Sequence, residues 1–576
     1  MAKSGAYVGQ MSMVESLGLL SPCHSLDELD SEEKRKALGS VYTPKFLGDW
    51  LAITLISLLD RSKKVKVVDP ACGDGALLLA LATAAHCSGI AVELTGLDVD
   101  KFALNNLTDR VKAETIHCDA IMSCSFDGQF DGLIANPPWG ANVGCSPQEL
   151  RALGFSLAKG QFDSYDLFLE MGMRMVKPGG ALAWIVPDSI FSEQHASTRK
   201  LIASSSQIEM IGRLGEGIFD GVFRGTAVVI LVNQKPKENH EIRCFRLGSR
   251  QREAISKGTS SLSEFAADFI LVPQDRFLKS NSDSWETDIE ESDVSCISKI
   301  RSLGGDWTAG LIGGRGVELS KNGRIVQCQN CHFGVALPKT ELQYCENCGV
   351  SFSQVVPLAR SVISAIGNCS RNTAPFLVGE DVDRHRATPS RRIELGINGI
   401  NYKRDQDFSE RKLLVRKTGV GLKAAVDNSG SITNQVVYHY RIDDEGDRPD
   451  WYLDFLEGVL CSRIMYAYYL KSHGETEWRS HPYITQSTLA RLPIPMIGSM
   501  GPIWKRAREI ANATIRLRAR MTLEEELAVE NLVAGLYRLT NDECDWALGV
   551  IAAAQPLEPV RSLRLPSAMT VRPLVI

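Results

Sequence analysis

The chain has 576 residues, a length that predicts roughly three or four structural units and not one hydrophobic core. Its composition, 44% hydrophobic and 23% charged, excludes a disordered, collagen-like or coiled-coil protein. The formal net charge of −5 excludes a surface that is basic throughout, while leaving room for a local basic region. The sequence shows neither a membrane-spanning apolar run nor a secretory signal, so we expect a cytoplasmic protein whose 15 cysteines are mostly reduced.

Shifts in composition divide the chain into successive segments. The acid-rich stretch 280–294 indicates a solvated linker, and Thr522-Leu-Glu-Glu525 is a capping box that predicts a helix running to Leu536. We therefore expect a helical arm, an α/β domain, a connecting segment, a β-rich domain and a helical C-terminus, over residues 1–40, 41–245, 246–300, 301–500 and 501–576.

The α/β domain alternates β-prone runs with amphipathic helical stretches. A helix is expected over residues 75–85, and strands over residues 64–69, 91–97, 130–135, 181–186 and 227–232. Strands separated by helices imply right-handed crossovers, so the pattern predicts a Rossmann-like fold with a mainly parallel, doubly wound sheet.

A glycine-rich turn follows the first predicted strand, in the segment Asp69-Pro-Ala71-Cys72-Gly73-Asp-Gly75. Gly73 and Gly75 allow the backbone to turn sharply and to approach a ligand, and the next helix offers its N-terminus. The spacing differs from G-x-G-x-x-G, and the lysine of a phosphate loop is missing. The turn therefore disfavours a dinucleotide and a nucleoside triphosphate.

Two acids follow the next two strands of the α/β domain. Asp98 ends Gly96-Leu-Asp98, where a carboxylate can accept both ribose hydroxyls of an adenosine group. Asp119 follows His117-Cys118, in a position to meet an adenine amino group. An adenosine-containing ligand that needs no phosphate loop suggests S-adenosylmethionine.

The tetrapeptide Asn136-Pro137-Pro138-Trp139 follows the fourth strand. Its prolines fix the backbone and present carbonyl groups that no local amide satisfies. An exocyclic amine of a nucleobase could donate hydrogen bonds to the Asn136 side chain and the Pro137 carbonyl while the indole of Trp139 stacks on the ring. The tetrapeptide therefore predicts methyl transfer to an amine nitrogen.

With these motifs the sequence resembles the N6-adenine DNA methyltransferases of restriction-modification systems, in the gamma-class order. Asp69–Gly75 matches the D-P-A-C-G-[SD]-G form and Asn136–Trp139 the N-P-P-[YFW] form, while Val41-Tyr-Thr43-Pro44 resembles the motif near the methionine part of the cofactor. The resemblance implies that S-adenosylmethionine is bound by Thr43, Pro44, Asp69, Ala71, Cys72, Gly73, Gly75, Asp98, Asp119 and Asn136.

Later segments extend the resemblance. Tyr165-Asp166-Leu-Phe168, Lys177-Pro-Gly-Gly180 and Ile185-Val-Pro187 resemble the motifs that follow the tetrapeptide in this family. Ile218-Phe219 resembles the loop that supplies a second aromatic ring against the flipped base. This loop is one residue longer than the familiar form, so Phe219 is the expected stacking partner of Trp139 and Phe223 is the alternative.

Four cysteines form the pattern C-x2-C-x13-C-x2-C, namely Cys328, Cys331, Cys345 and Cys348. Two such pairs suit a tetrahedral four-thiolate site, and Gly349 suits the tight turn after the second pair. We expect a structural zinc ribbon over residues 328–348. His332 is adjacent to this ribbon but is not needed as a ligand.

Residues 384–424, here called the basic segment, carry eleven Lys or Arg against four acids, a local charge of +7. A solvated basic face and a phosphate-contacting surface fit this composition equally well. The order of the surrounding segments resembles the TaqI-like specificity domain, which favours DNA. The resulting candidates for DNA contact are Arg315, Arg391, Arg392, Arg416 and Lys417.

Together these features predict a base-flipping, site-specific DNA adenine-N6 methyltransferase of the prokaryotic cytoplasm and nucleoid. Residues 41–245 would be its catalytic domain and residues 301–500 its target-recognition domain. About 40 residues precede the motifs, too few for a nuclease, so a separate endonuclease or defence subunit would cleave. The alternatives are an RNA adenine-N6 methyltransferase, a glutamine-N5 protein methyltransferase and a catalytically silent DNA-binding subunit.

Overall fold

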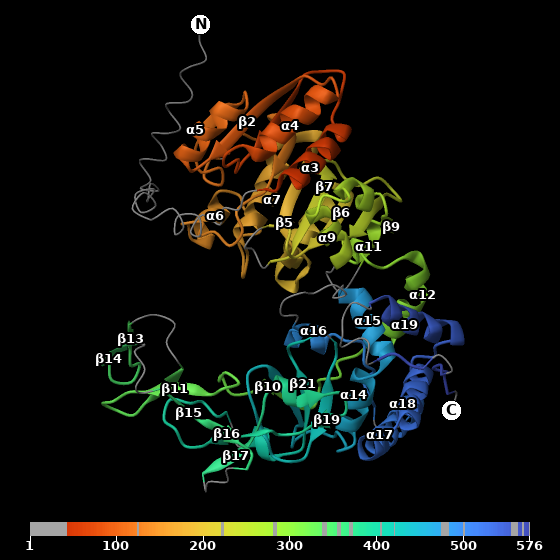
Figure 1. The fold of residues 1–576 in the computed structure, drawn as a ribbon. Helices are drawn as coiled ribbons and strands as arrows, with labels where there is room; N and C mark the ends of the chain where they lie inside the picture. Colours follow the sequence, from red (N-terminus) through yellow and green to blue (C-terminus); the bar gives the residue numbers. More distant parts are fainter. Residues whose placement is uncertain are drawn as a thin grey trace. The chain divides into compact units, whose positions relative to one another are not determined.

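The computed structural model describes residues 43–574, apart from the gaps given at the end of this paragraph. The chain divides into two compact units, with unit 1 ending at Glu290 and unit 2 beginning at Glu291 (Figure 1). The helical arm expected over residues 1–40 and the alternative aromatic residue Phe223 lie outside the described residues. The gaps are 124–125, 220–223, 280–284, 337–341, 354–358, 368–371, 404–405, 420, 474–482, 499–500, 555–562 and 567–568.

Unit 1 is built on one sheet of nine strands in the order β3-β2-β1-β4-β5-β7-β6-β8-β9. The first five strands in the chain pair in parallel, whereas β7 runs antiparallel to both β5 and β6. The doubly wound sheet is thus confirmed, with mixed pairing beyond β5. The strands are β1 (Val65–Asp69), β2 (Val92–Asp98), β3 (Glu114–His117), β4 (Phe130–Ala135), β5 (Val176–Pro187), β6 (Gln207–Gly215), β7 (Thr226–Val232), β8 (Glu241–Arg246) and β9 (Ile270–Pro273).

Helices pack on both faces of this sheet. Gly132 of β4 faces α3, because a Cβ atom added there would come within 3.1 Å of Leu59 directly after that helix. The next residue, Leu133, faces α7, where it lies together with Trp184 against Gly172. Because successive residues of a strand point to opposite faces, α3 and α7 cover opposite sides. The helices are α3 (Lys45–Leu58), α4 (Ala76–Cys87), α5 (Lys101–Arg110), α6 (Pro147–Ala152), α7 (Ser164–Met175), α8 (Ala196–Ser205), α9 (Ser249–Ser256), α10 (Leu262–Ala266) and α11 (Asp275–Lys279).

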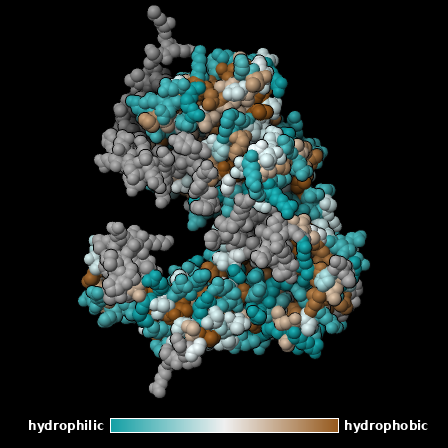
Figure 2. Space-filling view, in the orientation of Figure 1, coloured by the Kyte–Doolittle hydropathy of each residue, from teal (hydrophilic) through white to brown (hydrophobic). Residues whose placement is uncertain are grey.

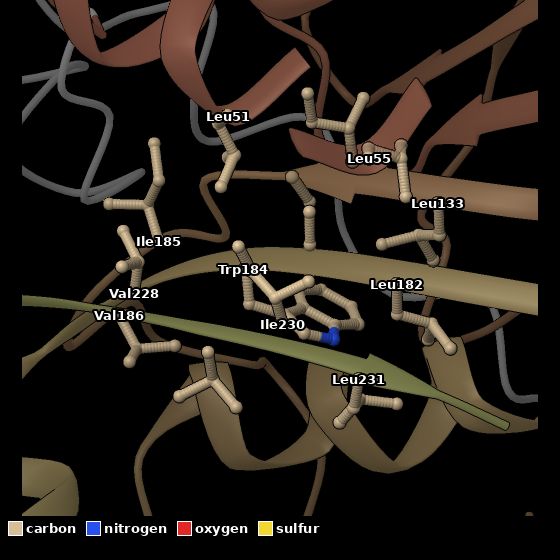
Figure 3. Packing of buried hydrophobic residues seen from close by; sticks show 14 of the residues in the cluster. Leu51, Leu55, Leu133, Leu182, Trp184, Ile185, Val186, Val228, Ile230 and Leu231 are labelled. Atoms are coloured by element: carbon tan, nitrogen blue, oxygen red, sulfur yellow. The ribbon is translucent and has the colours of Figure 1, made fainter. Parts of the chain in front are cut away.

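The core of unit 1 lies along β5 and β7, whose apolar residues are buried on both faces of the sheet. Such near-continuous apolar runs are typical of strands that helices cover on both sides. Figure 3 shows side chains of α3, β4, β5 and β7 packing together around Trp184. This rigid layer supports the loops that leave the carboxyl ends of the strands.

Residues 246–290 differ from the expected connecting segment, since β8 pairs with β6 and β9 pairs with β8 in the main sheet. Residues 285–288 of the acid-rich stretch are also held within unit 1. The carboxylate of Asp288 accepts hydrogen bonds from Arg246 at 2.8 and 2.6 Å, and the buried ring of Trp285 stacks on Phe277 at 5.7 Å. The charge pattern predicted a solvated linker because it does not reveal which acids have an arginine partner.

Unit 2 contains several small sheets. The two largest have four strands each, in the orders β10-β24-β21-β22 and β16-β20-β17-β23. A three-stranded sheet, β12-β11-β15, and two hairpins complete the β-structure of the described residues. The strands are β10 (Leu311–Arg315), β11 (Arg324–Gln327), β12 (Gly334–Ala336), β13 (Leu342–Tyr344), β14 (Ser351–Ser353), β15 (Ala359–Ser361), β16 (Ile363–Ala365), β17 (Thr373–Leu377), β18 (Val382–Asp383), β19 (Arg386–Ala387), β20 (Arg391–Glu394), β21 (Lys412–Arg416), β22 (Ala424–Asp427), β23 (Ile432–Thr433) and β24 (Val437–Ile442).

The helical part of unit 2 begins earlier than the expected residue 501, because α14 packs on α17 and α15 packs on α19. The expected cap is present, since the Glu525 amide donates to Thr522 Oγ1 at 3.3 Å as α18 begins. The helices are α12 (Glu291–Ser302), α13 (Gln406–Ser409), α14 (Tyr452–Leu460), α15 (Arg463–His473), α16 (Gln486–Ala490), α17 (Pro502–Arg520), α18 (Leu523–Leu536) and α19 (Asn541–Ala553).

Hydrophilic residues cover most of the visible surface of each unit, with hydrophobic residues scattered among them (Figure 2). Among the described helices, none has an apolar stretch long enough to cross a membrane.

Candidate functional site

The predicted cofactor residues of the α/β domain lie at the carboxyl ends of neighbouring parallel strands. In the sheet register Asp69 of β1 pairs with Gly96 of β2, and Asp98 pairs with His117 of β3. The loops that leave β1, β2, β3 and β4 therefore gather at one edge of the sheet, where such folds bind ligands.

The glycine-rich turn is held tightly to the end of β2. The Cys72 amide donates to the Leu97 carbonyl at 2.9 Å, and the Gly73 amide donates to Asp98 Oδ2 at 2.7 Å. Gly73 and Gly75 have φ angles of +51° and +82°, a region that favours glycine. An added Cβ at Gly75 would also come within 2.7 Å of Leu107. Both glycines are thus required by backbone geometry, and Gly75 by packing as well.

Three desolvated carboxyl groups lie at this edge. Burial raises the pKa of Asp69 to about 8, against the opposing hydrogen bond that its carboxylate accepts from the Ala71 amide. Burial also raises the pKa of Asp98 and of Asp119, although backbone amides donate to both. Asp98 and Asp119 are half-buried, and their carboxyl oxygens, already oriented by backbone amides, are suited to accept hydrogen bonds from a bound ligand.

Asn136, the first residue of the tetrapeptide, lies beside Thr43. Its Nδ2 atom donates to Thr43 Oγ1 at 3.3 Å, which joins two motifs 93 residues apart. Pro44 follows directly and its carbonyl accepts the Leu47 and Gly48 amides as α3 begins. The structure thus brings the first motif and the tetrapeptide together.

Trp139 and Phe219 form an aromatic pair. The ring centroids are 5.5 Å apart, the planes meet at 84°, and the two side chains are 8% and 3% exposed. Trp139 follows β4 and Phe219 follows β6, so tertiary structure alone brings them into contact. The contact places Phe219 beside Trp139, and the role of Phe219 as the second aromatic residue stays a prediction.

Two residues at the start of α7 hold the tetrapeptide loop and were missed in the sequence. Ser164 Oγ donates to the Pro138 carbonyl at 2.6 Å, and Asp163 Oδ1 accepts the Gly140 amide at 2.6 Å. The exposed Arg224 guanidinium lies 4.0 Å from the other oxygen of Asp163. The sequence pattern Asp163-x-x-Asp166 could have indicated these residues, because an acid three residues after an N-cap residue is typical of a capped helix start.

The four cysteines of the expected ribbon converge in unit 2. Their Sγ atoms all lie within 4.8 Å of one another, with Cys328 and Cys348 at 3.5 Å and Cys331 and Cys345 at 3.6 Å. Tetrahedral Zn–S bonds of about 2.3 Å require sulfur atoms about 3.8 Å apart, so the donor set fits zinc. His332 lies outside this group.

The surroundings act differently on the cysteines of this cluster, since burial raises the pKa of Cys345 to about 11 while backbone and side-chain donors lower the pKa of Cys348. Donors on Asn347 and on the Phe333 backbone lower the pKa of Cys331 to about 6. His332 and Gly349, each directly after the second cysteine of its pair, have φ angles of +58° and +72°. The two pairs thus share one turn geometry, and the thiolate is the form that binds metals.

Much of the basic segment forms ion pairs within unit 2. Arg391 pairs with Glu380 and Asp381, and Arg392 donates to the hydroxyl and carbonyl of Thr373. Further pairs are Arg384–Glu526, Arg411–Asp454, Lys412–Asp427 and Lys423–Asp383. Local charge therefore overstates the number of free cations.

Of the remaining candidates for DNA contact, Arg315 is exposed, whereas Arg416 and Lys417 are half-buried. Arg315 is 48% exposed and lies 3.5 Å from Glu318. Arg416 donates to the Thr418 carbonyl at 2.6 Å at the end of β21. Lys417 places its ammonium 5.6 Å from the ring of Tyr483, itself half exposed. A cation beside an exposed aromatic ring suits a nucleic-acid surface.

Comparison with known proteins matches each unit to a family. Residues 26–266 match the N-6 DNA Methylase family, and residues 374–494 match the TaqI-like C-terminal specificity domain. The type II methyltransferase M.BanIII of Aneurinibacillus aneurinilyticus is 32% identical over 237 residues, covering 34% of this chain and 40% of that relative. The type II methyltransferase M.TthHB8I of Thermus thermophilus is 27% identical over 206 residues, covering 34% and 45%.

Among solved structures, the type IIL restriction-modification enzyme MmeI in complex with DNA aligns over 94% of this chain and 78% of its own, with 12% identity and a TM-score of 0.49. The chain spans less than half the length of the two curated relatives. The chain thus combines a region that matches the N-6 DNA methylases with a region that matches the TaqI-like C-terminal specificity domain, and it is similar to type II methyltransferases.

Proposed function

We propose that this chain is a site-specific DNA adenine-N6 methyltransferase that moves a methyl group from S-adenosylmethionine to a flipped adenine in duplex DNA. One observation carries the proposal. Asn136 of the tetrapeptide lies beside Thr43 at the edge of the sheet where the glycine-rich turn is bonded to Asp98. A donor site and an acceptor site for a methyl group are thus adjacent in unit 1.

The residues at this edge fit S-adenosylmethionine, which supplies an electrophilic methyl group when bound. Each oxygen of the Asp98 carboxylate accepts one backbone amide, from Gly73 or from Asp100, and so retains a lone pair. Those lone pairs suit the two ribose hydroxyls. Asp119 would accept the adenine amino group, and the turn from Ala71 to Gly75 would approach the ligand with its backbone.

The tetrapeptide would hold the acceptor nitrogen. The Asn136 side chain and the Pro137 carbonyl accept the two amine hydrogens, which shifts electron density onto the nitrogen and aims its lone pair. Trp139 and Phe219 supply apolar surfaces for the extruded base. Residues Asn136, Pro137, Pro138 and Trp139 are thus the proposed catalytic group.

We further propose that Cys328, Cys331, Cys345 and Cys348 hold a structural zinc ion. Their sulfur spacing supports a closed four-thiolate site. The metal would stabilise a ribbon that is otherwise held by short strands.

Unit 2 would read the DNA target. Arg315 is the exposed cation among the candidates, and the half-buried Arg416 and Lys417 would add to it. Arg391 and Arg392 would contact phosphate only with donors left over from their internal bonds. A separate endonuclease would complete a restriction-modification pair, and chromosomal DNA as substrate places the enzyme in the cytoplasm. The RNA alternative gains no support, because the matched families are named for DNA.

The deciding experiment compares Asn136→Ala with the wild type in single-turnover methylation of duplex DNA and of structured RNA. Loss of the transition-state hydrogen bond should lower the rate by ~10²–10³. Calorimetry should find S-adenosylmethionine binding nearly unchanged, because Asn136 holds the acceptor. Asn106→Ala, on the exposed side of α5, is the matched control. Retained turnover in Asn136→Ala, or wild-type transfer to RNA alone, would contradict the proposal.

A further inference from the structure

The tetrapeptide has little capacity to fix its own shape. Pro137 and Pro138 carry no backbone N–H, so two of its four residues cannot donate to any local acceptor. Their rings fix φ, and Pro138 restricts the ψ angle of Pro137 before it. The ψ angle of Pro138 has no such restraint, yet it sets the direction of the following Trp139. The loop therefore depends on contacts from elsewhere in unit 1.

Those contacts come from Asp163 and Ser164 at the start of α7. Ser164 Oγ donates to the Pro138 carbonyl at 2.6 Å, which is shorter than its 3.0 Å approach to Asp163 Oδ1. The Ala141 amide donates back to Ser164 Oγ at 3.2 Å, and the Gly140 amide donates to Asp163 Oδ1 at 2.6 Å. Ser164 is 3% exposed, so water does not compete for its hydroxyl.

The start of α7 is itself fixed by a buried cluster of three residues, Asp166, His195 and Thr198. The Asp166 carboxylate accepts the Asp163 amide at 2.8 Å, His195 Nδ1 at 2.8 Å and Thr198 Oγ1 at 2.7 Å. The Asp163 amide belongs to the N-cap of α7 itself, whereas His195 and Thr198 lie at the start of α8. The start of α7 can therefore move away from α8 only by breaking buried hydrogen bonds.

We propose that Ser164 is a positioning residue of the methyl transfer, which it serves by holding the Pro138 carbonyl and thereby the plane of Trp139. The inference rests on the proposed function for its catalytic consequence. The Asp166–His195–Thr198 cluster holds Ser164 in place by fixing the start of α7, on which Ser164 lies. Ser164 touches neither the cofactor nor the adenine, and acts through the loop alone.

The test uses the full chain and the variant Ser164→Ala, with Ser206→Ala as the matched control. Ser206 is also a buried serine of unit 1, and its hydroxyl contacts Met173 sulfur instead of the loop. Amide hydrogen exchange over residues 139–146 should rise at least tenfold in Ser164→Ala and stay unchanged in Ser206→Ala. Since misplacement of reacting groups by about 1 Å can cost ~10² in rate, single-turnover methylation should fall by about 10- to 100-fold.

The dissociation constant of S-adenosylmethionine should stay within twofold, because Ser164 bonds to the tetrapeptide loop and not to the glycine-rich turn or to Asp98. The loss of thermal stability in Ser206→Ala measures what the removal of a buried hydroxyl costs in unit 1, and the loss in Ser164→Ala is compared with it. Unchanged exchange over residues 139–146, or a methylation rate within twofold of the wild type, would overturn the positioning role. If the wild type methylates no DNA, the proposed function fails, while the exchange measurement still decides whether Ser164 holds the loop.

Discussion

The ring of Phe219 meets the ring of Trp139 edge to face, with centroids 5.5 Å apart and planes at 84°. The two residues are 80 positions apart, on loops that follow β4 and β6. Edge-to-face contact is a favourable arrangement for two aromatic rings when nothing lies between them. For an adenine to stack between the two rings, they must move apart. We therefore expect the positions of Trp139 and Phe219 to differ when a flipped base is bound.

Phe219→Ala should weaken capture of the flipped adenine, since base–aromatic stacking is worth ~1–3 kcal/mol per base. We expect the KM for duplex DNA to rise about tenfold, and 2-aminopurine at the target position to report a smaller extruded fraction. Phe219→Tyr should retain near-normal values because it keeps the ring. Phe269→Ala, at an exposed phenylalanine of unit 1, is the control. Normal 2-aminopurine fluorescence in Phe219→Ala would assign the stacking role to another residue.

Asp98→Ala should weaken S-adenosylmethionine binding by about 1.5–3 kcal/mol, because neutral hydroxyl donors lose a charged acceptor. The Gly73 amide also loses its partner, so the glycine-rich turn should exchange its amides faster. Isothermal calorimetry and hydrogen exchange measure the two effects separately. DNA affinity should be unchanged, as should all values for the exposed Asp109→Ala. An unaltered cofactor affinity in Asp98→Ala would place the ribose contact elsewhere.

Cys345→Ser should lower zinc content and sequence-specific DNA binding together, because the binding energy of the metal is folding energy for so small a ribbon. Elemental analysis of freshly purified, reductant-treated protein should find one zinc per chain in the wild type and in Cys87→Ser, whose cysteine is exposed and outside the cluster. Cofactor binding by unit 1 should persist. Protein that contains no zinc would refute the site, and specific methylation without zinc would make the ribbon peripheral to DNA reading.

His439 should make the stability of the chain depend on pH. Burial lowers the pKa of His439 to about 4, against the opposing charge of Asp407. Its stabilising contribution is complete above the unfolded value near 6.5 and is lost as the pH falls toward 4, because the unfolded chain takes up the proton first. At pH 5.5, about one unit below the unfolded value, this loss is about 1.4 kcal/mol.

Urea unfolding at pH 8 and pH 5.5 measures this loss, with His439→Gln as the non-titrating comparison. The wild type should lose about 1.4 kcal/mol more than the variant over this interval. Equal losses in the two proteins would show that His439 does not keep its proton-free form in the folded state.

The sequence by itself predicted which residues would carry the chemistry, and it determined which strands precede them. Asp69–Gly75 and Asn136–Trp139 could be placed because each follows a short apolar run that is typical of a buried parallel strand. The four cysteines could be paired because two C-x2-C units leave few alternatives. These features are local, so spacing along the chain suffices to find them.

Only the tertiary structure decided which groups have partners. Ser164 reaches Pro138 across 26 positions, and Lys412, counted among the free cations of the basic segment, is buried against Asp427. Residues 246–290 contribute β9 to the main sheet because β9 pairs with β8, which itself pairs with β6. A hydrogen bond or an ion pair forms only between segments that are close in the folded chain, and local composition does not predict which segments those are.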